Sequence, residues 1–290
     1  MDRGIGCVNE FESRYFPLKR EFPRRVKRFS KDREVPQKRV RITGSLLRQW
    51  QVFIKSPFPE AAGKKLAFIS DWHWHDSPRQ QKILAELTAF MRQFAPDILL
   101  LGGDMCDDAD TLYQQKELLE KIAAFAPLVL AVGGNWESGK RWLKKDFFAG
   151  LYRSCGINYL ENSEFVNEFF AVTGMPDISS IKFHNIELPV HDDKVNILMT
   201  HNPDGVVALD KRGFLGKYQL IVCGHNHGGQ VRVPFFGAVY CPSFYHRKFV
   251  RGIFRHRDHH FKMLVSSGIG EHRGTFRCFC PPEVLTVEFK

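Results

Sequence analysis

The sequence contains no long apolar run. None of its apolar stretches approaches the ~18 residues that a membrane-spanning helix needs. The pair Arg24-Arg25 is similar to a twin-arginine signal, but the charged segment Val26-Lys27-Arg28-Phe29 follows it where a signal peptide has an apolar region. We therefore expect no membrane span and no signal peptide, and we predict a cytoplasmic protein.

Cysteines are few and irregularly spaced. There are seven, an odd number, and no Cys-x-x-Cys pair stands among them. A disulfide framework needs paired cysteines, and a structural zinc site usually needs closely spaced thiolates. The sequence therefore predicts free, buried thiols in a reducing compartment.

Acidic residues are in the minority, and the imbalance is concentrated near the N-terminus. The formal net charge is +10, and residues 1–41 hold 13 Lys or Arg and six Asp or Glu, a difference of +7. Residues 1–38 show no sustained hydrophobic period, so we predict a basic N-terminal arm over 1–38 and a single domain over 39–290. Such an arm either attracts anionic membranes or nucleic acid, or is a solvated tail. The lack of a nucleic-acid-binding motif disfavours nucleic acid.

From residue 39 onward, apolar strands alternate with helical patterns. Strands are predicted at 40–43, 50–54, 65–70, 97–101, 128–132, 195–200 and 218–223, and helices at 80–94, 112–125 and 142–153. This alternation predicts βαβ units and a largely parallel sheet. Short strand-like runs between 229 and 290 predict a second sheet packed on the first, so the fold class is α/β.

Five of the predicted strands end in polar residues that can bind metals. The motifs at these ends are Asp71-Trp72-His73, Gly102-Gly103-Asp104, Gly133-Gly134-Asn135, His201 and Gly224-His225-Asn226-His227. In open α/β sheets, ligands bind outside the carboxyl ends of the strands. Carboxylate, amide and imidazole groups without thiolates suit Mn, Fe, Zn or Co. Two such ions about 3.5–4 Å apart can hold an attacking hydroxide and neutralise phosphoryl oxygens.

The order of these motifs resembles the calcineurin-like metallophosphoesterase superfamily from about residue 64 to the C-terminus. That family has Asp-x-His, Gly-Gly-Asp, Gly-Asn-His-Asp/Glu, a lone His and Gly-His-x-His. The motifs Pro242-Ser243, Ser266 to Gly270 and Phe279 to Val284 are similar to the bacterial branch of membrane-associated phosphodiesterases and UDP-2,3-diacylglucosamine hydrolases.

The resemblance implies a four-layer fold, a sandwich of two mixed sheets flanked by helices. It also implies two divalent metal ions. Asp71, His73 and His227 would hold the first ion, Asn135, His201 and His225 would hold the second, and Asp104 would bridge them.

One position departs from the family pattern, because Trp136 stands where the family has a His beside the leaving group. Tryptophan donates one hydrogen bond but cannot titrate. Either the leaving group needs no acid, as for a pyrophosphate with its low pKa, or His75 substitutes for the missing acid, or the activity has been lost.

The first interpretation favours a two-metal hydrolase of phosphodiester or pyrophosphate bonds, in which a metal-bound hydroxide attacks phosphorus. A lipid-linked substrate such as UDP-2,3-diacylglucosamine, and so a role in lipid metabolism, is one candidate. A phosphomonoesterase and a non-catalytic interaction module are the alternatives, and the complete ligand set argues against the module.

Two further features are candidate parts of the site. Arg247, Lys248 and Arg251 lie among aromatic residues and are candidates to bind a phosphate or an anionic lipid headgroup, or they belong to a solvated strand pair. Glu137 either anchors the Asn135 loop or begins a helix. Together with the basic arm, these charges predict peripheral binding to the inner membrane face.

Overall fold

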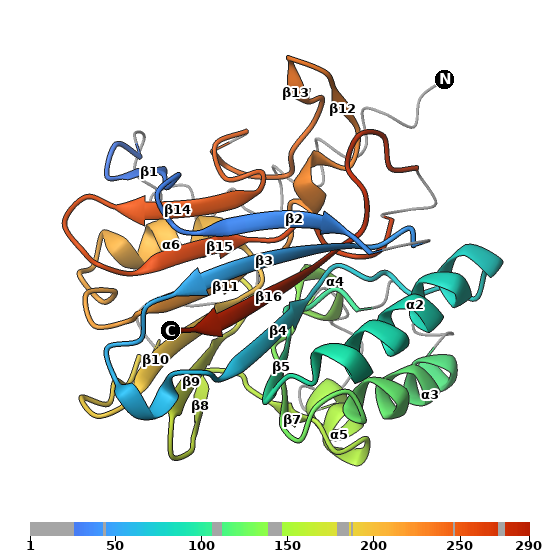
Figure 1. Cartoon of the computed structure of the whole chain (residues 1–290), viewed down its shortest axis with the longest axis horizontal. Helices are drawn as coiled ribbons and strands as arrows, with labels where there is room; N and C mark the ends of the chain where they lie inside the picture. Colours follow the sequence, from blue (N-terminus) through green and yellow to red (C-terminus); the bar gives the residue numbers. More distant parts are fainter. Residues whose placement is uncertain are drawn as a thin grey trace.

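The computed structural model describes residues 26–42, 45–105, 112–138, 147–178, 186, 188–245, 247–271 and 276–290. The chain forms two seven-stranded mixed sheets and a short two-stranded ribbon (Figure 1). Within the described residues, no helix is long and apolar enough to cross a membrane.

The first sheet combines strands from both ends of the chain. Its order is β2 (Gln37–Arg41), β3 (Arg48–Ile54), β16 (Glu283–Phe289), β4 (Lys65–Ile69), β5 (Ile98–Leu101), β6 (Val129–Ala131) and β7 (Asn158–Tyr159). Strands β4 to β7 run parallel, whereas β16 runs antiparallel to β4 and parallel to β3. The C-terminal strand therefore lies inside the first sheet, and the prediction that assigned the C-terminal strands to the second sheet is wrong for this one.

The second sheet has the order β1 (Phe29–Lys31), β14 (Gly252–His256), β15 (Lys262–Val265), β11 (Leu220–Cys223), β10 (Val195–Thr200), β9 (Phe170–Met175) and β8 (Ser163–Val166). Strands β9, β10, β11 and β15 are parallel to one another. The sequence patterns predicted β10 and β11 but missed β8, β9 and β14.

The two sheets pack face to face around one apolar core. Phe68 and Leu100 from the first sheet meet Ile197 and Val222 from the second in this core. Alternation along β4 explains the packing, because Leu66 and Phe68 face this core whereas Ala67 and Ile69 face the helices on the other side.

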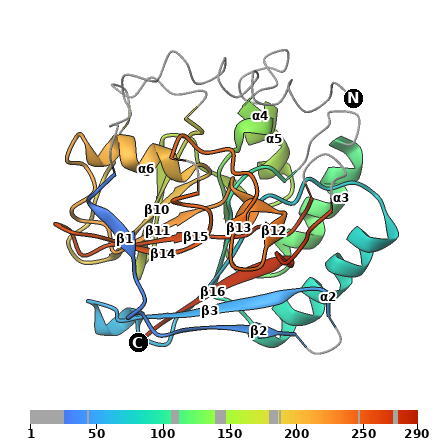
Figure 2. The ribbon, with the colours of Figure 1, turned by 90° about the horizontal axis from the view of Figure 1, so that it is seen from above.

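Helices cover the outer faces of both sheets. The first sheet packs against α2 (Pro78–Phe94), α3 (Leu112–Ala123) and α5 (Phe147–Ser154), and the second against α6 (Pro203–Asp210) (Figure 2). Helix α2 begins where the Ser77 hydroxyl accepts a hydrogen bond from Gln80 N, with Pro78 in its first turn. The four-layer α/β sandwich is thus confirmed.

The segment expected to be a basic arm is partly built into the sheets. Residues 1–25 lie outside the described part of the chain, but residues 26–38 include β1 and the first residues of β2. Phe29 is buried and packs edge-to-face against Phe249. This strand is therefore part of the second sheet's core.

The five described cysteines are free, and four of them are buried, as the sequence predicted. Cys7 and Cys106 lie outside the described residues.

Candidate metal centre

The candidate ligands come together where the two sheets meet. Asp71, Asp104 and Asn135 follow β4, β5 and β6 of the first sheet, and His201 and His225 follow β10 and β11 of the second. Two clusters form, one of Asp71, His73 and His227 and the other of Asp104, His201 and His225, and all six residues are buried. The seven side chains predicted from strand ends therefore gather at one edge of the sandwich.

The second cluster is arranged so that lone pairs converge. His201 Nδ1 lies 2.8 Å from the Gly102 carbonyl oxygen, and His225 Nε2 lies 2.8 Å from the Pro242 carbonyl oxygen. Carbonyls only accept hydrogen bonds, so these two nitrogens carry the protons and the other ring nitrogens keep their lone pairs.

Those unprotonated nitrogens face oxygen ligands. His201 Nε2 lies 3.1 Å from both Asn135 Oδ1 and Asp104 Oδ2, and His225 Nδ1 lies 2.9 Å from Asn135 Oδ1 and 3.1 Å from His201 Nε2. In the neutral imidazoles, four electron-pair donors thus face one point. A divalent cation satisfies all four, and backbone carbonyls that fix the imidazole tautomers are the usual outer partners of metal-binding histidines.

The first cluster has the same character. His73 Nε2 and His227 Nε2 are 3.0 Å apart, and His227 Nε2 lies 3.7 Å from Asp71 Oδ1. Asp104 Oδ2 lies 4.0 Å from His73 Nε2, as well as 3.1 Å from His201 Nε2. Asp104 therefore lies between the two clusters, where a bridging carboxylate would be.

The electrostatics of the centre favour a cation. Burial lowers the pKa of His201, but the charge of Asp104 and contact with it outweigh burial, so the pKa is raised well above its ordinary value. Burial likewise raises the pKa of Asp104, but His201 outweighs it and the net pKa is lowered. The negative field that would hold a proton on His201 attracts a metal ion equally well, and metal binding displaces such protons.

Backbone strain is concentrated at these residues. Asp71, His73, Asp104, His225 and His227 all have positive φ angles, between 48° and 69°. Residues other than glycine seldom adopt this region, and strain of this kind persists where surrounding structure enforces it, often at functional sites. Gly224 and Gly134 allow the crowding, because a Cβ there would lie 2.4 Å from Asp71 Oδ2 and 2.1 Å from Asp104 Oδ1.

Glu137 ties the loops after β5 and β6 together. Its carboxylate accepts hydrogen bonds of 2.9 Å from the backbone N–H groups of Asp104, Met105 and Gly134. It also lies in the short helix α4 (Asn135–Ser138), so it both anchors the Asn135 loop and belongs to the helix. Burial, and then the charge of Asp104, raise the pKa of Glu137 to about 7.

Comparison with known proteins decides the family. The model of the calcineurin-like phosphoesterase family matches residues 64–229, more than half of the chain. The chain belongs to the calcineurin-like phosphoesterase family. It is therefore a metal-dependent phosphoesterase, and the two clusters fit a dinuclear metal site.

Three bacterial relatives align with most of this calcineurin-like phosphoesterase. Phosphodiesterase YaeI of Escherichia coli (strain K12) is 27% identical over 252 residues, which cover 84% of this chain and 87% of YaeI. The uncharacterized protein YpbG of Bacillus subtilis (strain 168) is 24% identical over 240 residues, covering 80% and 84%. The uncharacterized metallophosphoesterase YkuE of the same organism is 26% identical over 250 residues, covering 79% of each chain.

The two candidate proton donors occupy different positions in this phosphoesterase. The Trp136 ring lies edge-on to the His73 ring with centroids 6.2 Å apart, and Trp136 N donates to Asp104 Oδ1 at 2.8 Å. His75 is exposed, and its Nδ1 lies 3.2 Å from the His73 carbonyl oxygen. Trp136 therefore lies against the candidate ligand His73, and His75 contacts the backbone carbonyl of the same residue.

The three basic candidates have local partners. Arg247 is exposed, and its Nη1 donates a hydrogen bond of 3.5 Å to the Phe236 carbonyl oxygen. Lys248 Nζ donates to the Val26 carbonyl oxygen. Arg251 Nη1 lies 3.8 Å from Cys280 Sγ. Their binding of substrate stays a prediction.

One residue of the centre carried no signal in the sequence. Arg277 donates to the carbonyl oxygens of Gly270 at 2.7 Å, Ser267 at 2.9 Å and His227 at 3.4 Å. This guanidinium fastens the loop after β15 to the backbone of ligand His227. Its neighbours are backbone carbonyls brought together only by the fold, so no local motif could reveal it.

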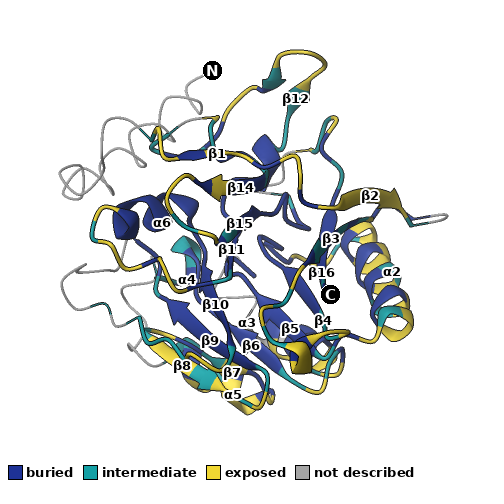
Figure 3. Cartoon of the chain, turned by 60° about the vertical axis from the view of Figure 1, so that its left-hand side comes forward, coloured by how far each residue is buried: buried dark blue, intermediate teal, exposed yellow. Residues whose placement is uncertain are grey.

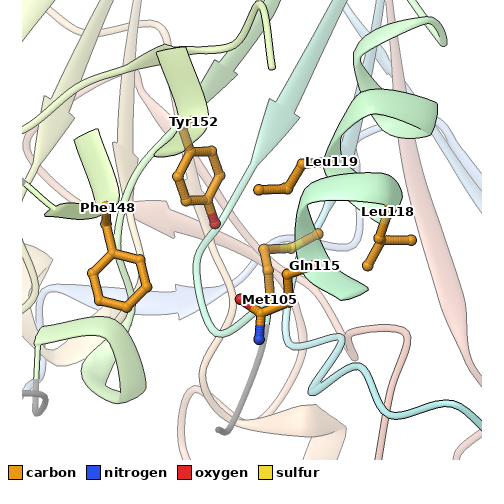
Figure 4. Close-up of a pocket in the computed structure, with 6 residues that line it drawn as sticks. All are labelled: Met105, Gln115, Leu118, Leu119, Phe148 and Tyr152. Atoms are coloured by element: carbon orange, nitrogen blue, oxygen red, sulfur yellow. The ribbon is translucent and has the colours of Figure 1, made fainter. Parts of the chain in front are cut away.

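A hollow lies beside the centre, between α3 and α5 (Figure 4). Met105, Gln115, Leu118, Leu119, Phe148 and Tyr152 line it. Met105 follows the ligand Asp104, but the lining contains no carboxylate or imidazole. We assign this hollow to helix packing rather than to catalysis.

Proposed function

We propose that this phosphoesterase hydrolyses phosphodiester or pyrophosphate bonds. Asp71, His73 and His227 would hold one divalent metal ion, Asn135, His201 and His225 the other, and Asp104 would touch both. When bound, the ions supply positive charge for the phosphoryl oxygens and lower the pKa of a water molecule. Manganese, iron, zinc and cobalt all suit these ligands.

The observation that carries the proposal is the position of Trp136 beside His73. The indole N–H of Trp136 can donate a hydrogen bond but no proton, so it suits a leaving group that departs as a stable anion. A phosphate leaving group is such an anion, whereas an alkoxide needs an acid that typically contributes about 10²–10⁴ in rate. An indole rather than an imidazole at this position therefore favours pyrophosphates, and diesters with a stabilised leaving group such as an aryloxide, over esters that release an alkoxide.

The relatives add independent support. One of them is named as a phosphodiesterase. Its alignment covers most of both chains, so it includes the whole metal centre.

The substrate class is tested with purified protein loaded with Mn²⁺. Three substrates are compared at equal concentration, namely a bis-aryl phosphodiester, an alkyl phosphomonoester and a nucleotide-sugar pyrophosphate that carries acyl chains, such as UDP-2,3-diacylglucosamine. We expect turnover of the diester and the pyrophosphate to exceed that of the monoester. A strong preference for the monoester would contradict the proposal, and turnover of the diester alone would remove the lipid-linked substrate from it.

A further inference from the structure

A short ribbon next to the metal centre presents aromatic side chains to solvent. Strands β12 (Arg232–Val233) and β13 (Gly237–Ala238) form it, and it projects from the body of the molecule with an exposed tip (Figures 1 and 3). At the tip, the exposed fraction is 105% for Phe235 and 80% for Phe236. These two phenylalanines bury almost no surface in the monomer.

More exposed apolar side chains lie on the ribbon and on the segment that pairs with its first residues. The segment 276–280 is joined to the ribbon by a bridge between Val231 and Cys278 and by a hydrogen bond from Arg232 N to the Cys278 carbonyl. The large apolar residues exposed on the ribbon and on this segment are Val233, Phe235, Phe236, Val239, Tyr240, Phe276 and Phe279. Contiguous exposed apolar surface of this kind marks an interaction site more often than chance exposure.

The conformation of Phe235 argues against an accidental placement. Its φ angle is +67°, a value that favours Gly, Asn or Asp, and Gly237, two residues further on, also has positive φ. A polar turn residue would relieve the strain and remove an apolar side chain from water. The sequence instead keeps an aromatic residue at a strained, fully exposed position.

The chain segment that contains the ribbon carries charge of one sign. Residues 211–257 contain no Asp or Glu but include Arg232, Arg247, Lys248 and Arg251. Arg247 reaches the carbonyl oxygen of Phe236, and Arg232 Nη1 donates to the Gly228 carbonyl at the base of the ribbon. Burial, followed by the charges of Arg232, Arg251 and Arg39, lowers the pKa of Lys31, which places β1 beside the same cations.

The ribbon is also joined directly to the metal centre. It begins after the 3-10 turn η4 (His227–Gly229), which contains ligand His227, and the chain returns to Pro242, whose carbonyl contacts ligand His225. At its base, a Cβ on Gly229 would lie 2.3 Å from Ala238 Cβ. A partner that binds the tip of the ribbon is therefore bound close to the metal centre.

We propose that the β12–β13 ribbon inserts Phe235 and Phe236 into the interfacial region of an anionic lipid bilayer, while the surrounding Arg and Lys side chains contact the lipid phosphates. Aromatic side chains favour this depth, and anionic membranes attract clustered cations. A projecting tip of two aromatic residues suits the interface of a lipid bilayer, and the Arg and Lys residues of segment 211–257, which lacks Asp and Glu, disfavour pairing with a second copy of the same segment. The inference does not depend on the substrate, because an enzyme acting on soluble diesters could bind a membrane in the same way.

The test uses the full chain and the variant F235N/F236N. Asparagine suits the φ angle of Phe235, so the variant should unfold at the same temperature as the wild type or higher. The matched control is F214N, which removes a phenylalanine that is 42% exposed on the loop after α6. Binding is measured by co-sedimentation with vesicles of phosphatidylcholine with and without about 30% phosphatidylserine, and insertion by the rise in surface pressure of a lipid monolayer.

We expect the wild type and F214N to bind the anionic vesicles and to raise the monolayer pressure. F235N/F236N should bind at least about tenfold more weakly, because burying one Phe side chain contributes more than the free energy of a tenfold change. Its turnover of a soluble bis-aryl diester should be unchanged, which separates this inference from the proposed function. Equal binding by F235N/F236N, no binding by the wild type, or a dimer that the two substitutions abolish would each overturn the proposal.

Discussion

Asp104 Oδ2 lies 3.1 Å from His201 Nε2, and this contact joins the carboxyl end of β5 in the first sheet to that of β10 in the second. The two residues are 97 positions apart in the sequence and both are almost completely buried. A buried carboxylate and an imidazole with a fixed tautomer form half of the second candidate metal position. The first prediction follows from this pair.

Replacing His201 with Asn should remove one of the two metal ions. The variant keeps Asp104 and the first cluster, so we expect metal content after reconstitution to fall from about two ions per chain to about one. Loss of the second charge should lower diester turnover by about 10²-fold or more. His191→Asn, at a partly exposed His that pairs with Glu164, is the control and should keep both ions. Unchanged metal content in His201→Asn would show that this cluster is not a metal position.

Replacing Glu137 with Gln should destabilise the metal-free protein. The Gln amide can offer only one oxygen to the three backbone N–H groups that Glu137 now satisfies, and its NH₂ group would face one of them. We expect a loss of about 1–3 kcal/mol in the free energy of unfolding, measured by urea denaturation. Glu117→Gln, at an exposed position on α3, should change it by less than about 0.5 kcal/mol. A similar stability for both variants would mean that the Glu137 bonds contribute little.

Replacing Trp136 with His should change the preference between substrates. A titrating ring next to His73 could protonate an alkoxide, so hydrolysis of an alkyl phosphomonoester should rise by up to about 10²-fold, whereas pyrophosphate hydrolysis should change little. The ratio of kcat/KM for the two substrates measures this. Trp136→Phe, which removes the indole N–H without adding an acid, should not raise the monoester rate. A parallel change in both rates for Trp136→His would show that proton donation at this position does not set the substrate class.

The parts of the fold and of the candidate metal centre that could be predicted from the sequence are those encoded by short, local sequence patterns. The clustering of the candidate ligands was predictable because each follows an apolar strand, and the carboxyl ends of strands are where α/β proteins bind ligands. The full extent of the second sheet was less visible, because β8 is largely exposed and only Ile253 and Phe254 are apolar in β14, so neither strand forms a long apolar run. The pairing of β16 with both β3 and β4 is also non-local, since strands from opposite ends of the chain meet there.

Contacts made through the backbone were the hardest to foresee. Pro242 and Gly102 fix the tautomers of His225 and His201 through their carbonyl oxygens, which every residue possesses. The aromatic tip at Phe235 was likewise not singled out, because an aromatic residue in a sequence usually indicates a core position. Exposure can be judged only after the strands have been placed.

Because of Asp204, the free energy of unfolding should decrease as the pH rises from about 4 to about 6. Burial raises its pKa to about 6, although Ser243 Oγ and Phe244 N donate to its carboxylate. The folded pKa lies above the unfolded value, so in this window the folded protein binds more protons than the unfolded chain. The free energy of unfolding therefore decreases as pH rises through the window, by at most about 3 kcal/mol from this group. Comparison of metal-free wild type with Asp204→Asn isolates the effect, because the variant should lack this part of the slope; parallel curves would contradict the assignment.

The last prediction concerns the basic N-terminal region. Residues 1–25 hold six Lys or Arg and four acids, whereas residues 26–41 hold seven Lys or Arg and two acids, so most of the excess charge lies in the described segment around β1 and β2. Deleting residues 1–38 would also remove the buried Phe29, and a loss of binding could then reflect unfolding. Neutralising exposed charges is therefore the sharper experiment, and the variant is K27Q/R33Q/K38Q.

Each of these three side chains should contribute about 1 kcal/mol to binding of an anionic surface at low salt. We expect K27Q/R33Q/K38Q to bind phosphatidylserine vesicles about 10²-fold more weakly than the wild type at low ionic strength, and the difference should shrink as salt shortens the Debye length. The control K82Q/K116Q/K121Q removes the same charge from exposed positions on α2 and α3, which cover the outer face of the first sheet, and should bind nearly as well as the wild type. If the two triple variants lose equal affinity, net charge alone drives association and the position of the basic residues around β1 and β2 has no special role.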